Sequence, residues 1–318
     1  MSKRDYTLLF DSEEGKKYLP VEVTDSISAY SNITFSSDFF KFVNDHKVSV
    51  DIVDKYGNQV GMFIGSNCGT RGRTMIKQAE LYLDHNRRLS IAKSLETAYL
   101  HNIFSNLKYY NRRINSSKIE DELSLEKHYL DKINGSTNID ELMLTEARFR
   151  GNYYSLFNEI IHDSDYEFVQ RSKRPPKDPL NAMISFGNTV LYNRLATEIS
   201  KTSLDIRIGL VHSTNNRSQT LNLDLADLFK PILIDRTIFT LINRRMLKID
   251  RDFTEAENDG IYFSTIGKRI FLSEFNKKLY QKQNDNGTSK SYAIRLRDEV
   301  QKVYRMVMYG EKYKPYKY

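Results

Sequence analysis

The spacing of hydrophobic and polar positions changes near residue 84. Before that point, short segments rich in β-branched and aromatic residues alternate with polar turns, which is typical of strands. The predicted strands are YTLLF, KKYLPVEV, SISAYS, VSVDIVD, QVGMFIG and RTMIKQAELYL. Tyr56-Gly57-Asn58 separates two of them as a hairpin turn would. One helix is predicted among the strands, SSDFFKFVNDHK, with Ser36 or Ser37 as its N-cap.

After residue 84 the apolar positions follow helical spacing, first in RRLSIAKSLETAYLHNIFSNLKYYNRR. Asn138 and Glu141 form a capping box that begins a second long helix. Asp178 followed by Pro179 predicts the start of a third. Further helices are expected from about Leu223 and over residues 291–309, and GIYFSTIGKRIFL reads as a hairpin leading into a helix.

This pattern predicts an α+β fold in which a small N-terminal β-sheet domain, residues 1–84, precedes a larger, mostly α-helical domain, residues 85–318. A chain of 318 residues can bury a core in each. Its composition, 40% hydrophobic and 28% charged, is globular, and no segment approaches the roughly 18 to 20 apolar residues of a membrane span. The N-terminus MSKRDYTLLF lacks a signal-peptide pattern, so we expect a cytoplasmic protein with no membrane partner. The single cysteine, Cys68, excludes an internal disulfide and a multi-cysteine zinc site.

The basic charge is confined to the C-terminal part. Residues 1–85 hold 10 Lys and Arg against 12 Asp and Glu, whereas the remainder hold 38 against 29. A basic domain beside a mildly acidic one fits a module that binds a polyanion, joined to a module with another task. A solvated surface without a partner explains the charge equally well.

Glu146 is predicted to lie on an apolar helix face. At about 100° per residue, the helix that begins at Asn138 places it near the centre of a hydrophobic stripe. The stripe consists of Ile139, Leu142, Met143, Phe149, Tyr153, Phe157, Ile160 and Ile161. Burying an unpaired carboxylate costs several kcal/mol. Glu146 therefore needs a cation, and Arg150, one turn on, favours an internal ion pair when the helix is considered alone. His162 falls on the opposite, solvated face.

Asp224 and Asp227 raise the same question in LNLDLADLFKPILIDRTIF. They are three residues apart and share a helix face, whereas Lys230 is expected on the other side of the helix. His212 ends the apolar run DIRIGLV, where a histidine commonly serves as a core or capping residue. A loop that folds back towards Asp224 makes it a candidate third ligand. Two carboxylates and one imidazole suit Mg²⁺ or Mn²⁺, which can polarise a phosphodiester and activate water or a 3′-hydroxyl.

Basic residues surround these positions in the sequence. Taken singly, each is a solvated charge; taken together, they predict a track for DNA phosphates. They are Arg171, Lys173, Arg174, Lys230, Arg236, Arg244 and Arg245. We assign DNA contacts to Arg174, Lys230, Arg236, Arg244 and Arg245.

Several blocks resemble, in order and spacing, the signature of the universal CRISPR-associated integrase family, often called "Cas one", and most closely its type I-B version. The blocks are TEARFRGNYYSLFNEII, RSKRPPKDPLNAMISFGNTVLY, GLVHS and LNLDLADLFKPILIDRTIF. The resemblance extends over nearly the whole chain. It implies that Glu146, His212 and Asp227 are the catalytic metal ligands and that Asp224 is a further acidic position.

The resemblance also implies an N-terminal domain for dimerisation and partner contacts and a helical catalytic domain that binds double-stranded DNA. The expected protein is a homodimer that works with the small partner "Cas two", carries Mg²⁺ or Mn²⁺, inserts captured DNA into a CRISPR array and cuts linear or branched DNA. Ala147, where many members have glycine, and residues 228–230 depart from the family pattern without removing a ligand. Two alternatives are a non-catalytic DNA-binding protein with structural carboxylate–arginine pairs and a repair nuclease outside CRISPR adaptation.

Overall fold

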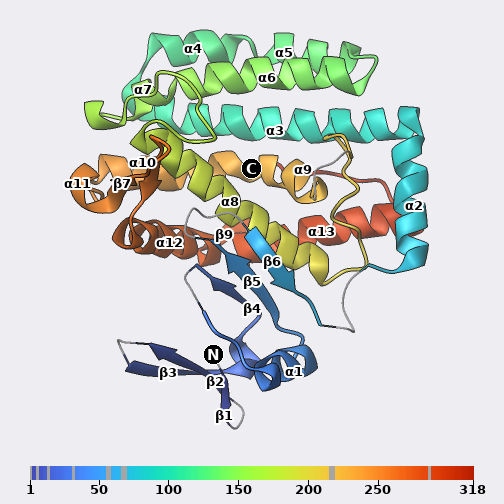
Figure 1. Cartoon of the computed structure of the whole chain (residues 1–318). Helices are drawn as coiled ribbons and strands as arrows, with labels where there is room; N and C mark the ends of the chain where they lie inside the picture. The colour runs from blue at the N-terminus through green and yellow to red at the C-terminus, as the bar shows by residue number, and fades with distance from the viewer. Residues whose placement is uncertain are drawn as a thin grey trace.

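The computed structural model describes residues 2–4, 7–12, 15–30, 33–54, 59–65, 70–214, 219–285 and 288–318. It confirms the α+β architecture, with strands in the first part and a larger helical body after them (Figure 1). Two three-stranded sheets occupy the N-terminal part, β1-β2-β3 and β4-β5-β6. The strands are β1 Ser2–Arg4, β2 Thr7–Ser12, β3 Gly15–Pro20, β4 Ser26–Ala29, β5 Ser49–Val53 and β6 Gln59–Phe63.

The first sheet is an antiparallel meander, whereas β4 pairs with β5 in parallel and β5 with β6 antiparallel. The parallel pair needs a crossover connection, and helix α1, Ser37–Asp45, supplies it. The 3₁₀ turn Val21–Val23 precedes β4. Ser36 is the N-cap of α1, as predicted, because its hydroxyl accepts a hydrogen bond from Phe39 N at 3.2 Å. The predicted turn at Tyr56-Gly57-Asn58 and Cys68 lie outside the described residues.

Residues 73–83 are a correction to the sequence prediction. The segment is not a strand but helix α2, Gly72–Leu83. Its buried positions are Thr74, Gln78 and Leu81, which follow helical spacing but include two polar residues that a hydrophobicity pattern overlooks. Gln78 joins α2 to the helical body by donating from Nε2 to the carbonyl of Asp205 at 3.0 Å. The helices therefore begin twelve residues before the predicted boundary at residue 84.

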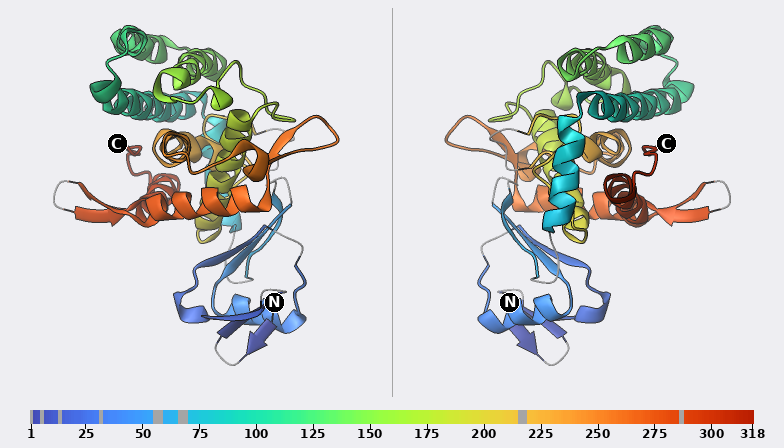
Figure 2. Two further views of the ribbon diagram at one scale, coloured as in Figure 1. Left: turned by 90° about the vertical axis from the view of Figure 1, so that its left-hand side faces the viewer. Right: turned by 90° about the vertical axis from the view of Figure 1, so that its right-hand side faces the viewer.

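Long helices form the layers that carry the functional residues (Figures 1 and 2). Asp84 caps α3, accepting from Arg87 N at 3.0 Å, and α3 lies beneath the layer made by α4 to α6. The helices of this half are α3 His85–Ile114, α4 Ser117–Ser124, α5 Glu126–Gly135, α6 Ile139–Ser155 and α7 Phe157–Ile160. A 3₁₀ turn follows at Ser164–Tyr166. The predicted helix from Asn138 is thus interrupted at Leu156.

The other half is organised around α8, which is buried along nearly its whole length. Asp178 caps it and Pro179 opens it, as predicted. Gly187 permits close packing, because a Cβ there would lie 2.7 Å from Ile234 and 2.8 Å from Phe271. The helices of this half are α8 Pro179–Ser200, α9 Leu221–Asp227, the π-helix η3 Lys230–Asp235, α10 Arg236–Asn243, α11 Ile249–Asp252, α12 Thr265–Tyr280 and α13 Tyr292–Tyr309.

Two small hairpins accompany these helices. Strands β7 Phe253–Glu255 and β8 Ile261–Phe263 form a hairpin that leads into α12. The segment GIYFSTIGKRIFL, predicted as a hairpin and a helix, contains β8 and the start of α12, and the first strand lies before it. Strands β9 Lys282–Asp285 and β10 Thr288–Ser291 form a second hairpin, which projects from the body before α13 (Figure 2). Among the described residues, no helix is both long enough and apolar enough to cross a membrane.

A polar chain crosses the core between α3, α6 and η3. Asn106 Nδ2 donates to the Tyr153 hydroxyl at 2.8 Å, and that hydroxyl donates to Asp235 Oδ2 at 2.9 Å. Asp235 is only 2% exposed. Burial raises the pKa of Asp235 to about 7, against the opposing effects of the Tyr153 hydrogen bond and the charge of Lys230. The folded protein therefore holds a proton on Asp235 that the unfolded chain releases near pH 4.

Substituting this residue, Asp235→Asn, is expected to stabilise the protein, and more so at high pH. The contribution of Asp235 to the free energy of unfolding falls as the pH rises from the pKa of the unfolded chain to that of the folded protein. Above the folded pKa the contribution no longer changes with pH. The variant should therefore gain roughly 2 to 3 kcal/mol more over the wild type at pH 8 than at pH 5, at about 1.4 kcal/mol per pH unit. Urea unfolding at both pH values measures this gain. The exposed substitution Asp165→Asn is the control, and an equal effect at both pH values would contradict the assignment.

Candidate active site

Glu146 lies inside the protein on α6. Asn138 fixes the start of this helix, because its side chain accepts a hydrogen bond from Glu141 N at 2.9 Å. The predicted stripe is buried against the core, with Leu142, Phe149 and Glu146 itself, which is 2% exposed. Arg150 Nη1 lies 2.7 Å from Glu146 Oε1, so the ion pair considered for the isolated helix is present. His162 is exposed, as predicted.

The ion pair does not satisfy the Glu146 carboxylate. Neither of its oxygens accepts a hydrogen bond, because the nearby guanidinium nitrogen of Arg150 is close but not aligned with Oε1. Burial raises the pKa of Glu146 above its usual range, and the charge of Asp227 adds to this, while Arg150, Lys230 and His212 oppose it. A buried carboxylate with open lone pairs has the capacity to bind a further cation.

Asp227 ends α9 and is 5% exposed. The expectation that Lys230 lies on the other side of the helix is wrong, because Lys230 Nζ is 2.5 Å from Asp227 Oδ1. Residues three apart share a helix face, and the chain widens into η3 at Lys230. Burial would raise the pKa of Asp227, but the charges of Lys230 and His212 overcome this and lower it. Asp227 is therefore ionised and neutralised by Lys230, whose ammonium also lies 4.9 Å from the Tyr192 ring centroid.

Asp224 positions His212. Its Oδ2 accepts from the backbone N–H of Leu210 at 2.5 Å and of Val211 at 3.0 Å, and its Oδ1 accepts from His212 N at 2.9 Å. The imidazole completes the set, since its Nδ1 lies 2.7 Å from Oδ1. With Nδ1 held in this way, Nε2 is the ring nitrogen left for another partner.

These four contacts give Asp224 and Asp227 separate roles. Asp224 is occupied by the 210–212 segment, so it orients the imidazole of His212. Burial alone would lower the pKa of His212, but the hydrogen bond and charge of Asp224 raise it. Gly209 is required beside this carboxylate, because a Cβ there would lie 2.9 Å from Asp224 Oδ2 and 2.9 Å from Thr220 Oγ1.

The structure brings Glu146, Asp227 and His212 into one electrostatic cluster. The charges of Asp227 and His212 both shift the pKa of Glu146, and the charge of His212 also shifts that of Asp227. Across the described parts of the chain, no three His, Cys, Asp or Glu side chains already surround one point as metal ligands. Instead, Arg150 and Lys230 lie against the two carboxylates.

Sequence reasoning missed Glu96, a fourth buried carboxyl beside Glu146, Asp224 and Asp227. Glu96 lies on α3 and is 3% exposed, and its Oε2 has no hydrogen-bond partner. Burial raises the pKa of Glu96 well above its usual range, and the charges of Glu146, Asp227 and Asp224 add to this. Glu96 lies between Leu95 and Leu100 on an apolar helix face, and the same pattern identified Glu146.

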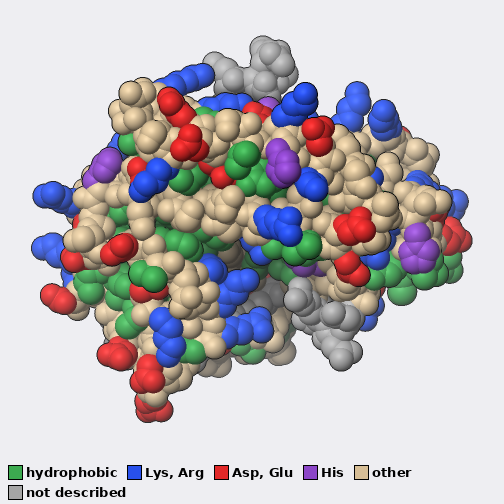
Figure 3. All heavy atoms as spheres, turned by 90° about the horizontal axis from the view of Figure 1, so that it is seen from above, with side chains coloured by type: hydrophobic (Ala, Val, Ile, Leu, Met, Phe, Trp, Pro, Cys, Tyr) green, Lys and Arg blue, Asp and Glu red, His purple; other side chains and the backbone are tan. Residues whose placement is uncertain are grey.

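Only part of the predicted basic track lies on the surface of the protein. Arg174, Arg244 and Arg245 are exposed and available to a ligand, and the molecule viewed from above shows a hollow flanked by Lys and Arg side chains (Figure 3). Lys230 and Arg236 are buried, which corrects the prediction that they lie on a DNA-binding surface. Arg236 packs 4.4 Å from the ring centroids of Tyr109 and Tyr318 and donates to Asn106, because its long side chain serves the core.

A basic helical domain that encloses two carboxylates and an oriented histidine is typical of proteins that process nucleic acids. Comparison with known proteins specifies the class. The family model for the CRISPR associated protein Cas1 matches residues 1–277, and the chain belongs to this family. A CRISPR-associated endonuclease Cas1 of Thermodesulfovibrio yellowstonii is 35% identical over 99% of this chain and 95% of its own length. The assignment confirms the resemblance at the level of the family and supports a nuclease role in CRISPR systems.

Solved structures agree with this assignment. The Cas1 protein of Thermotoga maritima superimposes with a TM-score of 0.84 at 29% identity, covering 99% of this chain and 96% of that one. A casposase bound to an integration product has a TM-score of 0.84 at 20% identity, covering 98% and 89%. The chain in a Cas6-RT-Cas1–Cas2 complex also scores 0.84, at 19% identity, covering 100% of this chain and 34% of its own. The last two establish a shared fold.

Proposed function

We propose that this protein is a metal-dependent DNA integrase and endonuclease of CRISPR adaptation, which inserts captured foreign DNA into the CRISPR array. The observation that carries the proposal is the Glu146 carboxylate, buried with both oxygens free of hydrogen bonds in a cluster with Asp227 and His212. Similarity to named Cas1 endonucleases supports the reaction class.

A divalent cation would require Arg150 and Lys230 to move aside, because among the described residues Glu146, His212 and Asp227 do not already converge as ligands. Glu146 has two buried oxygens with open lone pairs, Asp227 is held ionised, and Asp224 leaves Nε2 of His212 available. Carboxylate oxygens with one imidazole suit Mg²⁺ or Mn²⁺. Glu146, His212 and Asp227 would hold the ion, which when bound supplies charge stabilisation at the phosphate and activation of the attacking oxygen.

The chain's own residues would prepare the site for phosphoryl transfer. Asp224 holds the imidazole of His212 in one orientation, and Arg150 and Lys230 keep the carboxylates neutralised until they are used. The exposed Lys173, whose pKa is lowered by partial desolvation and by the charge of Arg150, is a proposed contact for an incoming phosphate. A DNA 3′-hydroxyl would attack the phosphodiester, forming one P–O bond as another breaks, and water in its place gives hydrolysis.

Double-stranded DNA, a second copy of the chain and a small Cas2-like protein are the proposed partners. A casposase with this fold has been solved with an integration product, and another Cas1 chain in a complex with Cas2, which supports these assignments by similarity. The exposed Arg174, Arg244 and Arg245 are the proposed DNA contacts. Action in the cytoplasm, where DNA is accessible, remains part of the proposal.

A second candidate is favoured by the ion pairs themselves. If Arg150–Glu146 and Lys230–Asp227 are permanent structural pairs, the protein would bind DNA without catalysis. The two candidates differ in whether a metal can take the place of Arg150.

Replacing Arg150 by glutamine is expected to make stability respond to Mn²⁺. In EDTA, Arg150→Gln leaves Glu146 buried without its cation and should lower the unfolding temperature, as loss of one partner of a buried pair does. Saturating Mn²⁺ should restore about 2.7 kcal/mol at a concentration 100 times its Kd. Differential scanning calorimetry with Mn²⁺ and with EDTA measures this without any activity assay.

Arg148→Gln provides the matched control, since Arg148 lies on the same helix but is exposed. The combined substitution Glu146→Gln and Arg150→Gln should abolish most of the Mn²⁺ response by removing a ligand. Stability that is indifferent to Mn²⁺ in both the wild type and Arg150→Gln would favour the non-catalytic candidate.

A further inference from the structure

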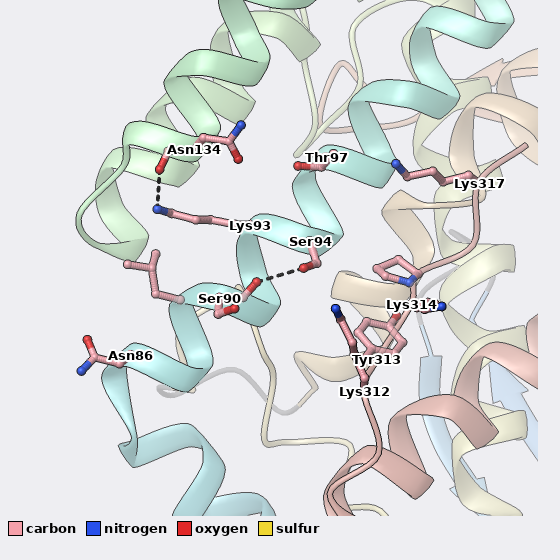
Figure 4. Close-up of a pocket in the computed structure, with 12 residues that line it drawn as sticks. Asn86, Ser90, Lys93, Ser94, Thr97, Asn134, Lys312, Tyr313, Lys314 and Lys317 are labelled. Atoms are coloured by element: carbon pink, nitrogen blue, oxygen red, sulfur yellow. Dashed lines mark hydrogen bonds between the residues drawn. The ribbon is translucent and has the colours of Figure 1, made fainter.

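A cavity of about 780 Å³ opens between α3 and the C-terminal segment 310–318 (Figure 4). It is lined from α3 by polar side chains that include Ser90, Ser94 and Thr97, and across from them by the extended tail. Asn134, at the end of α5, adds a further edge. Its volume falls within the range of ligand-binding sites, about 300 to 1,000 Å³. None of Glu146, His212 and Asp227 lines this cavity.

The tail is fixed in place by its tyrosines. The Tyr313 hydroxyl donates to Glu299 Oε1 at 2.6 Å, and the Tyr316 ring stacks on Phe229 with centroids 5.0 Å apart. Tyr318 N donates to Asn102 Oδ1 at 2.7 Å. The tyrosines of KYKPYKY thus anchor the segment to α3, to the junction between α9 and η3, and to α13.

The lysines of the same segment alternate with these anchors and line the cavity. Lys312, Lys314 and Lys317 are exposed and come from the tail, and Lys93 comes from α3. Figure 4 shows Lys312 and Lys317 extending towards α3, whereas Lys93 donates to the carbonyl of Asn134 at 2.6 Å. The anchored tyrosines therefore hold Lys312 and Lys317 facing α3, with Lys314 between them in the lining.

The lysines of this wall have no carboxylate beside them in the lining, although Lys93 also interacts electrostatically with Glu141 outside the cavity. The cavity lining contains four lysines and no Asp or Glu. Within the described part of the chain, none of the four lysines forms an ion pair. Four like charges around one space repel each other, and an anion that enters relieves this repulsion. Hydroxyl and amide groups beside lysines are the side chains that contact phosphate oxygens in protein–DNA interfaces.

We propose that this cavity binds the phosphate backbone of DNA as a second contact, separate from the catalytic cluster. This inference rests on the proposed function, because its ligand is the DNA on which the protein acts. The site would hold one flank of a duplex by its backbone, without reading its sequence, while another part occupies the catalytic cluster. Its contribution would be electrostatic and would depend strongly on salt.

Binding of a fluorescein-labelled 30-bp duplex in EDTA tests this, because EDTA separates binding from any metal-dependent reaction. The variant K312Q/K314Q/K317Q removes three charges and keeps every tyrosine anchor. We expect affinity at about 0.1 M salt to fall about tenfold or more, and the slope of log K against log salt to become shallower by about 2 to 3. The unfolding temperature should stay at the wild-type value, which shows that the tail remains docked.

The matched control is K17Q/K41Q/K127Q, three exposed lysines on β3, α1 and α5 that do not line the cavity. An affinity loss and slope change equal to those of this control would overturn the proposal. Inorganic tripolyphosphate should compete weakly, and competition as strong as that of unlabelled duplex would assign the cavity to a small polyphosphate instead. Because binding is measured in EDTA, the result does not depend on the proposed metal-dependent reaction.

Discussion

Replacing Glu146 or Asp227 by alanine is expected to lower metal-dependent strand joining about a thousandfold or more while the protein stays folded and binds DNA. Each substitution removes one proposed ligand of an ion that contributes several kcal/mol of transition-state stabilisation. About 4 kcal/mol corresponds to a factor of about a thousand in rate. The assay is joining of a short duplex with 3′-hydroxyl ends to a supercoiled plasmid that carries a CRISPR array, with and without the small partner protein and EDTA.

Glu146→Gln keeps the volume of the side chain and separates lost ligation from a cavity in the core. The matched control is Glu122→Gln, because Glu122 is also buried but pairs with the Tyr129 hydroxyl at 2.9 Å away from the cluster. It should join strands at close to the wild-type rate. Unchanged joining by Glu146→Ala or Asp227→Ala would remove the catalytic assignment and leave the ion pairs as structural.

Local signals in the sequence were sufficient for much of the fold. Ser36, Asn138 and Asp178 were identified as N-caps because a short polar side chain precedes an apolar helical pattern, and each accepts the expected backbone hydrogen bond. Helix α2 was missed for the converse reason. Its buried face contains Thr74 and Gln78, whose burial is explained by contacts with residues 203 and 205, far away in the chain.

The candidate site was predictable where one helix determines it and not where several meet. The period of α6 placed Glu146 on a buried face without any tertiary information. The pairing of Lys230 with Asp227 depends on how α9 passes into a π-helix, a change of backbone geometry that hydrophobic spacing does not encode. The helical projection that placed Glu146 on a buried face of α6 also places Glu96 on a buried face of α3.

The different roles of the two aspartates could not be predicted from their spacing. Asp224 and Asp227 are equivalent on a helical projection, since residues three apart share a face. They differ because segment 209–212 returns to α9 and presents three backbone N–H groups to Asp224 alone. Which aspartate orients His212 and which is the proposed metal ligand therefore depends on a long-range contact.

Substituting Asp224 by alanine is expected to be the most destabilising single change at the site. Leu210 and Val211 are each 2% exposed, so their N–H groups would be left buried without acceptors, at a cost of about 1 to 3 kcal/mol each. We expect a total loss of about 3 to 5 kcal/mol, measured by urea unfolding. Asp224→Asn should recover little of this stability, because the NH₂ group of the new amide would face backbone N–H groups, which are also donors. Asp178→Ala, which removes an N-cap elsewhere, should cost only about 1 kcal/mol.

Asp224→Ala should also lose strand joining at temperatures where it is still folded, because His212 is no longer oriented. If Asp224 acts on catalysis through the imidazole, adding His212→Ala to Asp224→Ala should lower the joining rate little further, whereas independent roles would multiply the two losses. A double variant that is slower by the full product would show that Asp224 contributes directly. Equal rates for Asp224→Ala and the double variant would show that the carboxylate serves the active site by holding His212 Nδ1.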